Sequence, residues 1–321
     1  MRRRLVALTL VPFLLFGAAA CGGEAEPSEG ASASIDMGEK IEGVEVSGAF
    51  GEEPKVTVDA PVSVNESVSQ VIRSGDGAEV LENKEALLHF TVYNGKNGKR
   101  LGSTYDQQVP QKASTQDGNL FPSMLDAIVG KPSGSRVLIA STPEQAYGPQ
   151  GLPDAGLSGE DTVIFVVDVL STHPAEVVNG PEGEEVEPPE GLPTVESRNG
   201  EVADVSFEDT PTKAPDELQV IPLIEGEGPP ARDDSFVTFD YYGVTWGGKK
   251  PFDQSYDREP IPFPVGINGL IQAWDEKIPG LKRGSRVMII APPETAYGDQ
   301  ARPGIPAGST LVFVVDVLGV D

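Results

Sequence analysis

Residues 237–246 read VTFDYYGVTW and carry the clearest strand signal in the chain. Val237, Phe239 and Tyr241 alternate with polar or outward residues, the period expected of a half-buried β-strand. Gly247 and Gly248 follow directly, and such a pair is typical of a turn. The segment therefore predicts one arm of a β-hairpin.

A single short helix is expected after this hairpin. Residues 269–280 read GLIQAWDEKIPG, and their apolar side chains recur at helical spacing before the Pro-Gly stop. These residues are Leu270, Ile271, Trp274 and Ile278. Short β-branched runs at 287–290 and 311–318 predict further strands. We expect an α+β fold in which a curled antiparallel β-sheet wraps over one short α-helix.

The same pattern occurs twice along the chain. Residues 144–148 read EQAYG and residues 294–298 read ETAYG, while FVVDVL at 165–170 returns unchanged at 313–318. Val46, Gly51 and Val56 recur as Val195, Gly200 and Val205. Repeats of this length indicate duplicated domains rather than solenoid units.

The ends of the chain and the segment between the repeats have other compositions. Residues 1–20 combine three Arg with an apolar core and small residues, which predicts an export signal. Residues 21–44 are expected to be a flexible acidic tether and residues 174–193 an acidic Pro-rich linker. The two domains are then domain 1, residues 45–173, and domain 2, residues 194–321.

Cys21 is the only cysteine and stands directly after the small residues of the signal. This arrangement resembles a bacterial lipoprotein signal, in which the cysteine is acylated and becomes the mature N-terminus. An ordinary cleaved signal with an incidental Cys21 is the alternative. The resemblance implies an extracytoplasmic protein, anchored to the cell membrane through its N-terminal lipid alone.

The charge of the chain excludes some partners. With 24 Lys and Arg against 50 Asp and Glu, the net charge is -26. Nucleic acids are bound by clustered cations that displace counterions, so we expect no nucleic-acid partner. One cysteine and two separated histidines, His89 and His173, form no metal-site spacing. We expect neither a metal nor an organic cofactor.

The second repeat is similar to FKBP-type peptidyl-prolyl cis-trans isomerases along its whole length. The matching motifs are the strand at 237–243, Phe252-Asp253-Gln254-Ser255, Arg258, Phe263, residues 270–274, Ala296-Tyr297-Gly298, Ile305-Pro306 and residues 310–313. The resemblance implies that both repeats share the FKBP fold. It also implies an enzyme that accelerates rotation about bonds preceding proline.

The chemistry of such an enzyme needs no nucleophile. The imide bond resists rotation by about 18 to 20 kcal/mol because its planar form is stabilised by resonance. A dry aromatic pocket that strips water from the carbonyl, with donors placed for the twisted state, lowers that barrier. Taken singly, aromatic residues on strands are usually core residues, so the assignment depends on their joint order.

The resemblance assigns roles to individual residues of domain 2. Trp274 is expected to form the pocket floor, and Tyr297 and the backbone N–H of Ile305 to hold substrate carbonyls. Tyr241 and Arg258 are expected to hold the Asp253 carboxylate, charged and poorly solvated, beside the twisting bond. The remaining substrate-binding positions are Phe252, Ile261, Phe263, Leu270, Ile271 and Phe313.

Domain 1 departs from the pattern at its centre. In the shared register Phe90 stands for Tyr241, Leu101 for Phe252, Gly102 for Asp253 and Met124 for Trp274, whereas Tyr147 and Phe165 are kept. We expect a retained fold with weak or no isomerase activity in domain 1, because the core replacements remain apolar.

Two functions follow from the sequence. In the first, domain 2 isomerises X-Pro bonds of unfolded or exported proteins. In the alternative, one or both grooves hold proline-containing segments without turnover. Whether macrolide inhibitors bind is left open.

Overall fold

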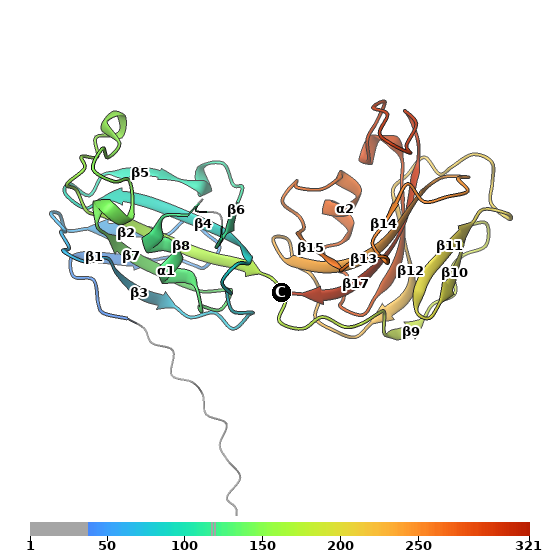
Figure 1. Cartoon of the computed structure of the whole chain (residues 1–321), viewed down its shortest axis with the longest axis horizontal. Helices are drawn as coiled ribbons and strands as arrows, with labels where there is room; N and C mark the ends of the chain where they lie inside the picture. Colours follow the sequence, from blue (N-terminus) through green and yellow to red (C-terminus); the bar gives the residue numbers. More distant parts are fainter. Residues whose placement is uncertain (1–37, 117, 119) are drawn as a thin grey trace, which may run out of the picture. The chain divides into compact units, whose positions relative to one another are not determined.

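The computed structural model describes residues 38–321 except 117 and 119, and the backbone but not the side chain of Ile261. Both repeats form mainly antiparallel sheets with one α-helix each (Figure 1). The expected α+β class is confirmed.

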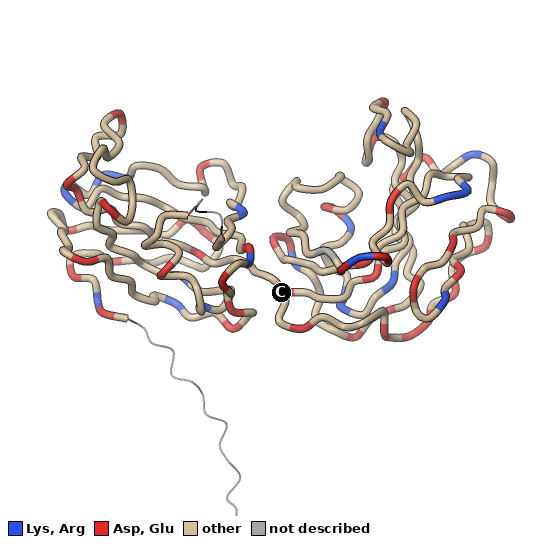
Figure 2. The backbone as a smooth tube through the Cα atoms, viewed as in Figure 1, with Lys and Arg blue, Asp and Glu red and all other residues tan. Residues whose placement is uncertain are grey.

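Within the described residues no helix is long and apolar enough to cross a membrane. Asp and Glu are spread along the strand ends and loops of both repeats (Figure 2).

Domain 1 contains a six-stranded sheet in the order β3-β7-β8-β4-β5, with β6 also paired to β4. Its helix α1 (Pro122–Ile128) places Met124 and Ile128 in the core beneath the sheet. The strands are β3 (Val68–Arg73), β4 (Glu85–Asn94), β5 (Arg100–Ser103), β6 (Gln111–Ser114), β7 (Arg136–Ser141) and β8 (Val163–Thr172). Short 3-10 turns are η1 (Thr104–Asp106), η2 (Pro143–Gln145) and η3 (Pro153–Ala155).

Domain 2 repeats this plan with the order β14-β13-β17-β16-β12-β9 and β15 paired to β13. Its helix is α2 (Gln272–Lys277), and its 3-10 turn η4 spans Pro293–Thr295. The strands are β9 (Gly183–Glu185), β12 (Gln219–Gly226), β13 (Phe236–Thr245), β14 (Asp253–Gln254), β15 (Ile261–Pro264), β16 (Arg286–Ala291) and β17 (Leu311–Val320).

Each sheet is buried on both faces, which the sequence did not predict. Helix α2 covers one face of the domain 2 sheet. A hairpin covers the other face and consists of β10 (Thr194–Arg198) and β11 (Glu201–Ser206) (Figure 1). The hairpin β1 (Val44–Ser47) and β2 (Lys55–Val58) covers the same face in domain 1. Burial on both faces explains why β8 and β17 are almost continuous apolar runs.

A buried arginine fixes each hairpin to its sheet. In domain 2 the Arg286 guanidinium donates to the Asp316 carboxylate at 2.6 Å and to the Gly200 carbonyl at 2.6 Å. In domain 1, Arg136 donates in the same way to Asp168 and to three carbonyls of the hairpin turn, those of Gly48, Ala49 and Glu52. The duplication therefore includes these hairpins and their anchors.

Two boundaries differ from the sequence expectation. Residues 38–44 of the expected tether belong to domain 1, because Ile41 and Val44 bury apolar side chains in the cluster under the hairpin. Part of the expected linker is also regular structure: residues 183–185 form β9 and pair with β12. The acidic side chains of β9 are exposed, which suits an edge strand.

Candidate active site

Helix α2 presents Trp274 to the concave face of the domain 2 sheet. The loop before the helix is fixed by Asp275, whose carboxylate accepts hydrogen bonds from the backbone N–H of Gly266 at 2.8 Å and of Leu270 at 2.9 Å. Asp275 is buried, so these bonds are shielded from water. They set the position of the residues that enter the helix, Leu270 and Ile271.

The Trp274 indole is in contact with aromatic rings from two strands, β13 and β17. Its ring meets Phe239, Tyr241 and Phe313 edge to face, with centroid separations of 4.8, 5.3 and 5.2 Å. Phe252 adds an edge-to-face contact with Phe313 at 5.6 Å, and Phe263 stacks on Phe239 at 5.9 Å. These rings pack together as one aromatic cluster around Trp274.

The indole N–H of Trp274 is buried and has no hydrogen-bond partner among the described residues. A buried donor without a partner costs free energy, on the order of 1 to 3 kcal/mol. Trp274 is 6% exposed, so bulk water does not compensate for the missing bond. The indole is therefore held here by the packing of its ring.

A polar cluster lies at the edge of this aromatic enclosure. The Tyr241 hydroxyl donates to one Asp253 oxygen, and an Arg258 amino group lies 3.0 Å from the other oxygen and 3.0 Å from the Tyr241 hydroxyl. Burial and the neighbouring Asp253 carboxylate raise the pKa of Tyr241 well above its usual range. Tyr241 therefore stays protonated at neutral pH and acts as a donor.

The solvation of Asp253 differs from the expectation. Its side chain is 48% exposed and that of Arg258 46%, so the carboxylate lies at a wet rim rather than in a poorly solvated place. The reason is that β14 is a two-residue strand at the edge of the sheet. The Asp253 carboxylate is therefore open to solvent on one side and paired with Arg258 on the other.

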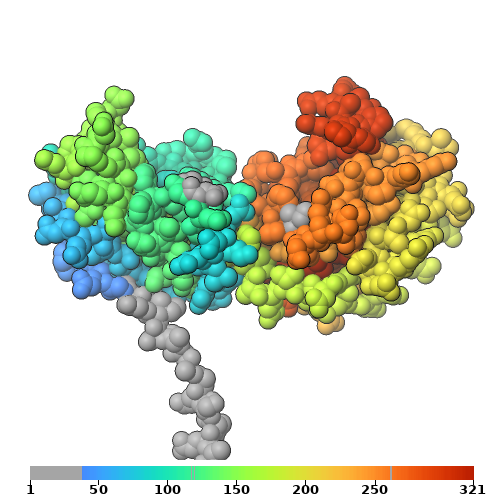
Figure 3. Space-filling model, in the orientation of Figure 1, coloured from blue at the N-terminus to red at the C-terminus, as the bar shows by residue number. Residues whose placement is uncertain are grey.

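The backbone N–H of Ile305 is also placed differently. It donates to the Arg302 carbonyl at 2.9 Å, and the Arg302 N–H donates back to the Ile305 carbonyl at 2.9 Å. Gly304, with φ of 76°, allows this tight turn. The Ile305 N–H, which was expected to donate to a substrate carbonyl, thus already donates to the Arg302 carbonyl. The turn belongs to the loop after η4, which projects from domain 2 (Figure 3).

Tyr297 lies at the base of the same loop. Its ring is half-buried against the aromatic core, and the Arg302 guanidinium lies 5.3 Å from the ring centroid. Phe263, Leu270, Ile271 and Phe313 also pack in this core. Two expected sites lie outside the described part of the structure, Cys21 and the side chain of Ile261. The backbone of Ile261, in β15, pairs with Phe239 in β13.

Two supporting residues were missed by the sequence reasoning. Ser255 is fully buried, accepts from the Tyr241 N–H at 2.8 Å and donates to Asp240 at 2.7 Å. Asp275 holds the loop before α2, as described above. The Phe-Asp-Gln-Ser motif was a signal for Ser255, whereas Asp275 read as an ordinary helix residue.

Domain 1 carries the expected replacements at equivalent positions. Phe90 pairs with Val167 in β8 as Tyr241 pairs with Val315 in β17, and Gly102 follows Leu101 in β5 as Asp253 follows Phe252. Met124 is fully buried in α1. Domain 1 therefore has neither the indole nor the carboxylate. In the described part of the chain no three His, Cys, Asp or Glu side chains are placed to hold a metal ion.

Comparison with known proteins agrees with this geometry. The family profile described as FKBP-type peptidyl-prolyl cis-trans isomerase matches residues 77–170 and 228–318, together more than half of the chain. Both matches begin after the hairpins, so β1–β2 and β10–β11 lie outside the matched domain.

Individual relatives cover one domain's length. A "Probable FK506-binding protein" of Corynebacterium glutamicum is 42% identical over 106 residues, 33% of this chain and 88% of that protein. The FKBP-type peptidyl-prolyl cis-trans isomerase FkpA of Escherichia coli K12 is 42% identical over 103 residues, 32% of this chain and 36% of that protein.

One similar solved structure is that of the three FKBP domains of wheat FKBP73. It is 18% identical with a TM-score of 0.34, and the match covers 79% of this chain and 94% of that chain. The crystal structure of FkpA from Escherichia coli has 39% identity, a TM-score of 0.30 and coverage of 32% and 48%. On the family match and its relatives, the chain belongs to the FKBP-type peptidyl-prolyl cis-trans isomerases, enzymes whose family binds proline-containing substrates and macrolides.

Proposed function

We propose that domain 2 carries the isomerase activity of this chain and acts on X-Pro bonds of exported proteins. The observation that carries the proposal is the Tyr241–Asp253–Arg258 cluster at the edge of the aromatic enclosure around Trp274. Domain 1 has Phe90, Gly102 and Met124 at the corresponding positions and lacks both features.

The mechanism is physical rather than covalent. The planar imide is stabilised by charge separation, which water supports at the carbonyl oxygen. In the proposed complex the proline ring lies on Trp274 and the walls of Phe252, Phe263 and Phe313 exclude that water. The planar form loses more stabilisation than the twisted form, so the barrier falls.

Polar groups then favour the twisted state. Tyr241 and Arg258 position Asp253 beside the rotating bond. There the carboxylate stabilises the charge distribution of the twisted imide by electrostatic interaction. The Tyr241 hydroxyl is engaged by Asp253, and the Ile305 N–H by Arg302. We therefore assign the donor for a substrate carbonyl to the Tyr297 hydroxyl.

The test is the Asp253→Val variant of the full chain. We expect its rate of prolyl isomerisation, measured by NMR exchange on a proline peptide, to fall by about tenfold, or ~1.4 kcal/mol of transition-state stabilisation. Asp257→Val is the control, because Asp257 is an exposed neighbour on the same loop. Equal rates for wild type and Asp253→Val would refute the role of the carboxylate.

We also propose that the protein is anchored outside the cytoplasmic membrane by acylation of Cys21. The support is the sequence of residues 1–21, in which the only cysteine follows an apolar segment and small residues. Metabolic labelling with an alkyne-bearing fatty acid should mark the wild-type protein and not Cys21→Ala. Equal labelling of the two would exclude this anchor.

Holding of client segments without turnover is the second candidate function. It is favoured by domain 1, which keeps the fold and a hollow but not Trp274 or Asp253. The two functions are compatible in one chain because they use different domains.

A further inference from the structure

An aromatic ring stands directly before the helix of domain 1. Phe121, which precedes α1, lies 4.6 Å from the Tyr147 ring and 5.5 Å from the Phe165 ring, measured between centroids. Its counterpart in domain 2 is the smaller Ile271. Met124 beneath it is fully buried. An aromatic side chain therefore takes the position in domain 1 that Ile271, an expected substrate-binding residue, has in domain 2.

Domain 1 also has a hollow of about 440 Å³, whose lining includes the counterparts of Tyr241, Phe252, Asp253 and Tyr297, namely Phe90, Leu101, Gly102 and Tyr147. It lies between β4, β5, the turn at residues 104–111 and the loop after Tyr147, and Phe121, Met124 and Phe165 do not line it. The lining residues described by the structure are Phe90, Val92, Leu101, Gly102, Ser103, Thr104, Gln107, Val109, Pro110, Gln111, Tyr147, Leu152 and Ala155.

Every described residue of this lining is uncharged, although the chain as a whole carries a net charge of -26. In domain 2 the equivalent surface is charged. Leu152 forms a bridge with Leu157, as Arg302 does with Ile305, and Val109 precedes β6 as Glu259 precedes β15. The replacement of Asp253, Glu259 and Arg302 by Gly102, Val109 and Leu152 removes the charges from one face of the domain.

The rim of the hollow exposes large apolar side chains. Val109 is 48% exposed and Leu152 36%, and they are two of the four large apolar residues exposed in the described part of the chain. Exposed apolar surface at a concave site is typical of a binding surface. Gln107 and Gln111 add uncharged amides at the same rim, which can bond a peptide backbone.

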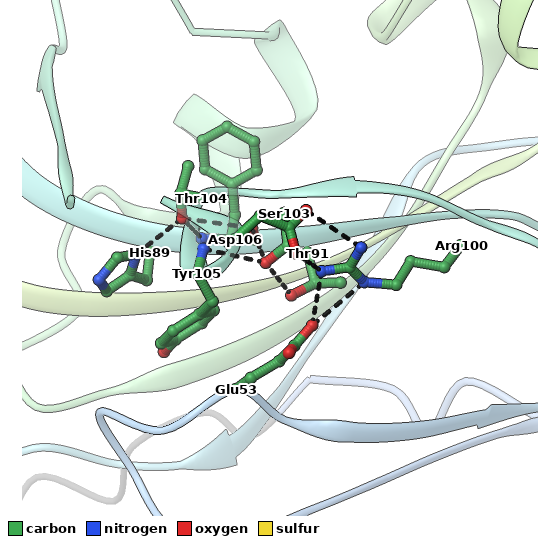
Figure 4. A network of polar contacts seen from close by, with 9 residues as sticks. Glu53, His89, Thr91, Arg100, Ser103, Thr104, Tyr105 and Asp106 are labelled. Atoms are coloured by element: carbon green, nitrogen blue, oxygen red, sulfur yellow. Dashed lines mark hydrogen bonds and ion pairs between the residues drawn. The ribbon is translucent and has the colours of Figure 1, made fainter. Parts of the chain in front are cut away.

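The turn that forms one wall is held rigidly. Figure 4 shows Arg100 between two carboxylates, with bonds of 2.7 Å to Glu53 and 2.6 Å to Asp106. On the other side of the turn, Thr104 bonds the buried His89 ring at 2.7 Å. The charge of Asp106, the acidic residue of this turn, is thus compensated by Arg100. The wall is pre-formed, so binding does not have to order it.

We propose that this hollow, at the position in domain 1 that the Asp253 cluster has in domain 2, binds extended, uncharged, apolar segments of non-native polypeptides, whether or not they contain proline. The proposal rests on the second candidate function above and names the class of segment that is held. Charged segments are excluded because burying a charge against an uncharged apolar lining is costly. The site holds a client segment while domain 2 acts on prolines elsewhere in the client. The proposal uses no catalytic residue of domain 2.

The test introduces a charge into the hollow without steric conflict. A Cβ at Gly102 would meet nothing within 4 Å, and the backbone there is not in the left-handed region. Gly102→Asp therefore places a carboxylate in the lining, and Gly102→Ser is the matched uncharged control. The probe is a short fluorescein-labelled peptide of Leu, Phe, Ser and Gly, end-capped and without proline or charge, whose binding to the full chain is followed by fluorescence anisotropy.

We expect wild type and Gly102→Ser to bind the peptide alike, and Gly102→Asp to bind on the order of tenfold more weakly. Absence of binding to wild type would overturn the proposal. So would equal binding by Gly102→Asp and wild type, or an equal loss in Gly102→Ser.

A second variant keeps the test decisive if Gly102→Asp fails to fold. Val109→Glu with Leu152→Arg changes two exposed side chains to their counterparts in domain 2 and should weaken binding similarly. The control is Leu81→Arg with Val177→Glu, at apolar residues that are 53% and 48% exposed and lie outside the hollow. If the control pair lost binding and the rim pair did not, the site would lie elsewhere and the proposal would be wrong.

Discussion

At the scale of single residues, the two domains differ where the chemistry differs. The sequence was sufficient to predict that Tyr241, Asp253 and Arg258 meet, because their motifs match the FKBP pattern in order, and the structure brings them together. It was not sufficient for the Ile305 N–H, whose partner depends on the conformation of a short loop. Nor did it predict the exposure of Asp253, which depends on the edge position of β14.

A titration prediction also belongs to this scale. Burial, with the neighbouring Asp233 and Asp321 carboxylates and despite Arg232, raises the pKa of Asp234 from 3.8 to about 6. The folded state therefore binds this proton more tightly than the unfolded state. Its contribution to stability is complete below pH 3.8 and is lost as the pH rises through about 6.

Asp234→Asn should remove this dependence. Asn tolerates the positive φ of 67° at this position. Because the side chain is partly solvated, we expect a gain of about 1 to 2 kcal/mol in the free energy of unfolding at pH 7.5, and little or none at pH 4. Urea unfolding at the two pH values measures it. A gain of the same size at both would show that the titration of Asp234 is not its source.

At the scale of elements, the hairpins are the main addition to the matched domain. Their duplication was visible in the sequence as the recurrence of Val46 as Val195 and of Val56 as Val205. The sequence did not show where the hairpins pack, because alternation shows that a strand has an apolar face but not what covers that face. The structure shows that they cover the second face of each sheet and that buried arginines anchor them.

The anchor gives a stability prediction. Arg286→Met leaves the buried Asp316 carboxylate without its cation and with only the Tyr256 hydroxyl donating to it at 2.8 Å. Breaking a buried ion pair in this way costs about 3 to 5 kcal/mol. Adding Asp316→Leu removes the unpaired charge and should restore part of the loss. Denaturant unfolding of the full chain, followed by the fluorescence of Trp246 and Trp274, measures both. A double variant less stable than Arg286→Met would contradict this account of the pair.

At the scale of the whole molecule, one fold occurs twice with different side chains at equivalent positions. The central strand pair keeps the same register in both domains, while the aromatic cluster of domain 2 contains Trp274 and the described lining of the domain 1 hollow carries no charge. The sequence predicted this asymmetry from four replacements. It could not predict the hollow of domain 1, which depends on how β5, the turn after it and the loop after Tyr147 are placed.

The most direct test of the central claim compares Trp274→Leu with Met124→Leu in the full chain, because the two substitutions place the same side chain at equivalent positions of α2 and α1. The measured quantity is the rate of prolyl isomerisation by NMR exchange, with folding checked by circular dichroism. We expect Trp274→Leu to lose about tenfold or more in rate, and Met124→Leu to stay within about twofold of wild type. Retained activity in a folded Trp274→Leu, or an equal loss in Met124→Leu, would contradict the assignment of catalysis to domain 2.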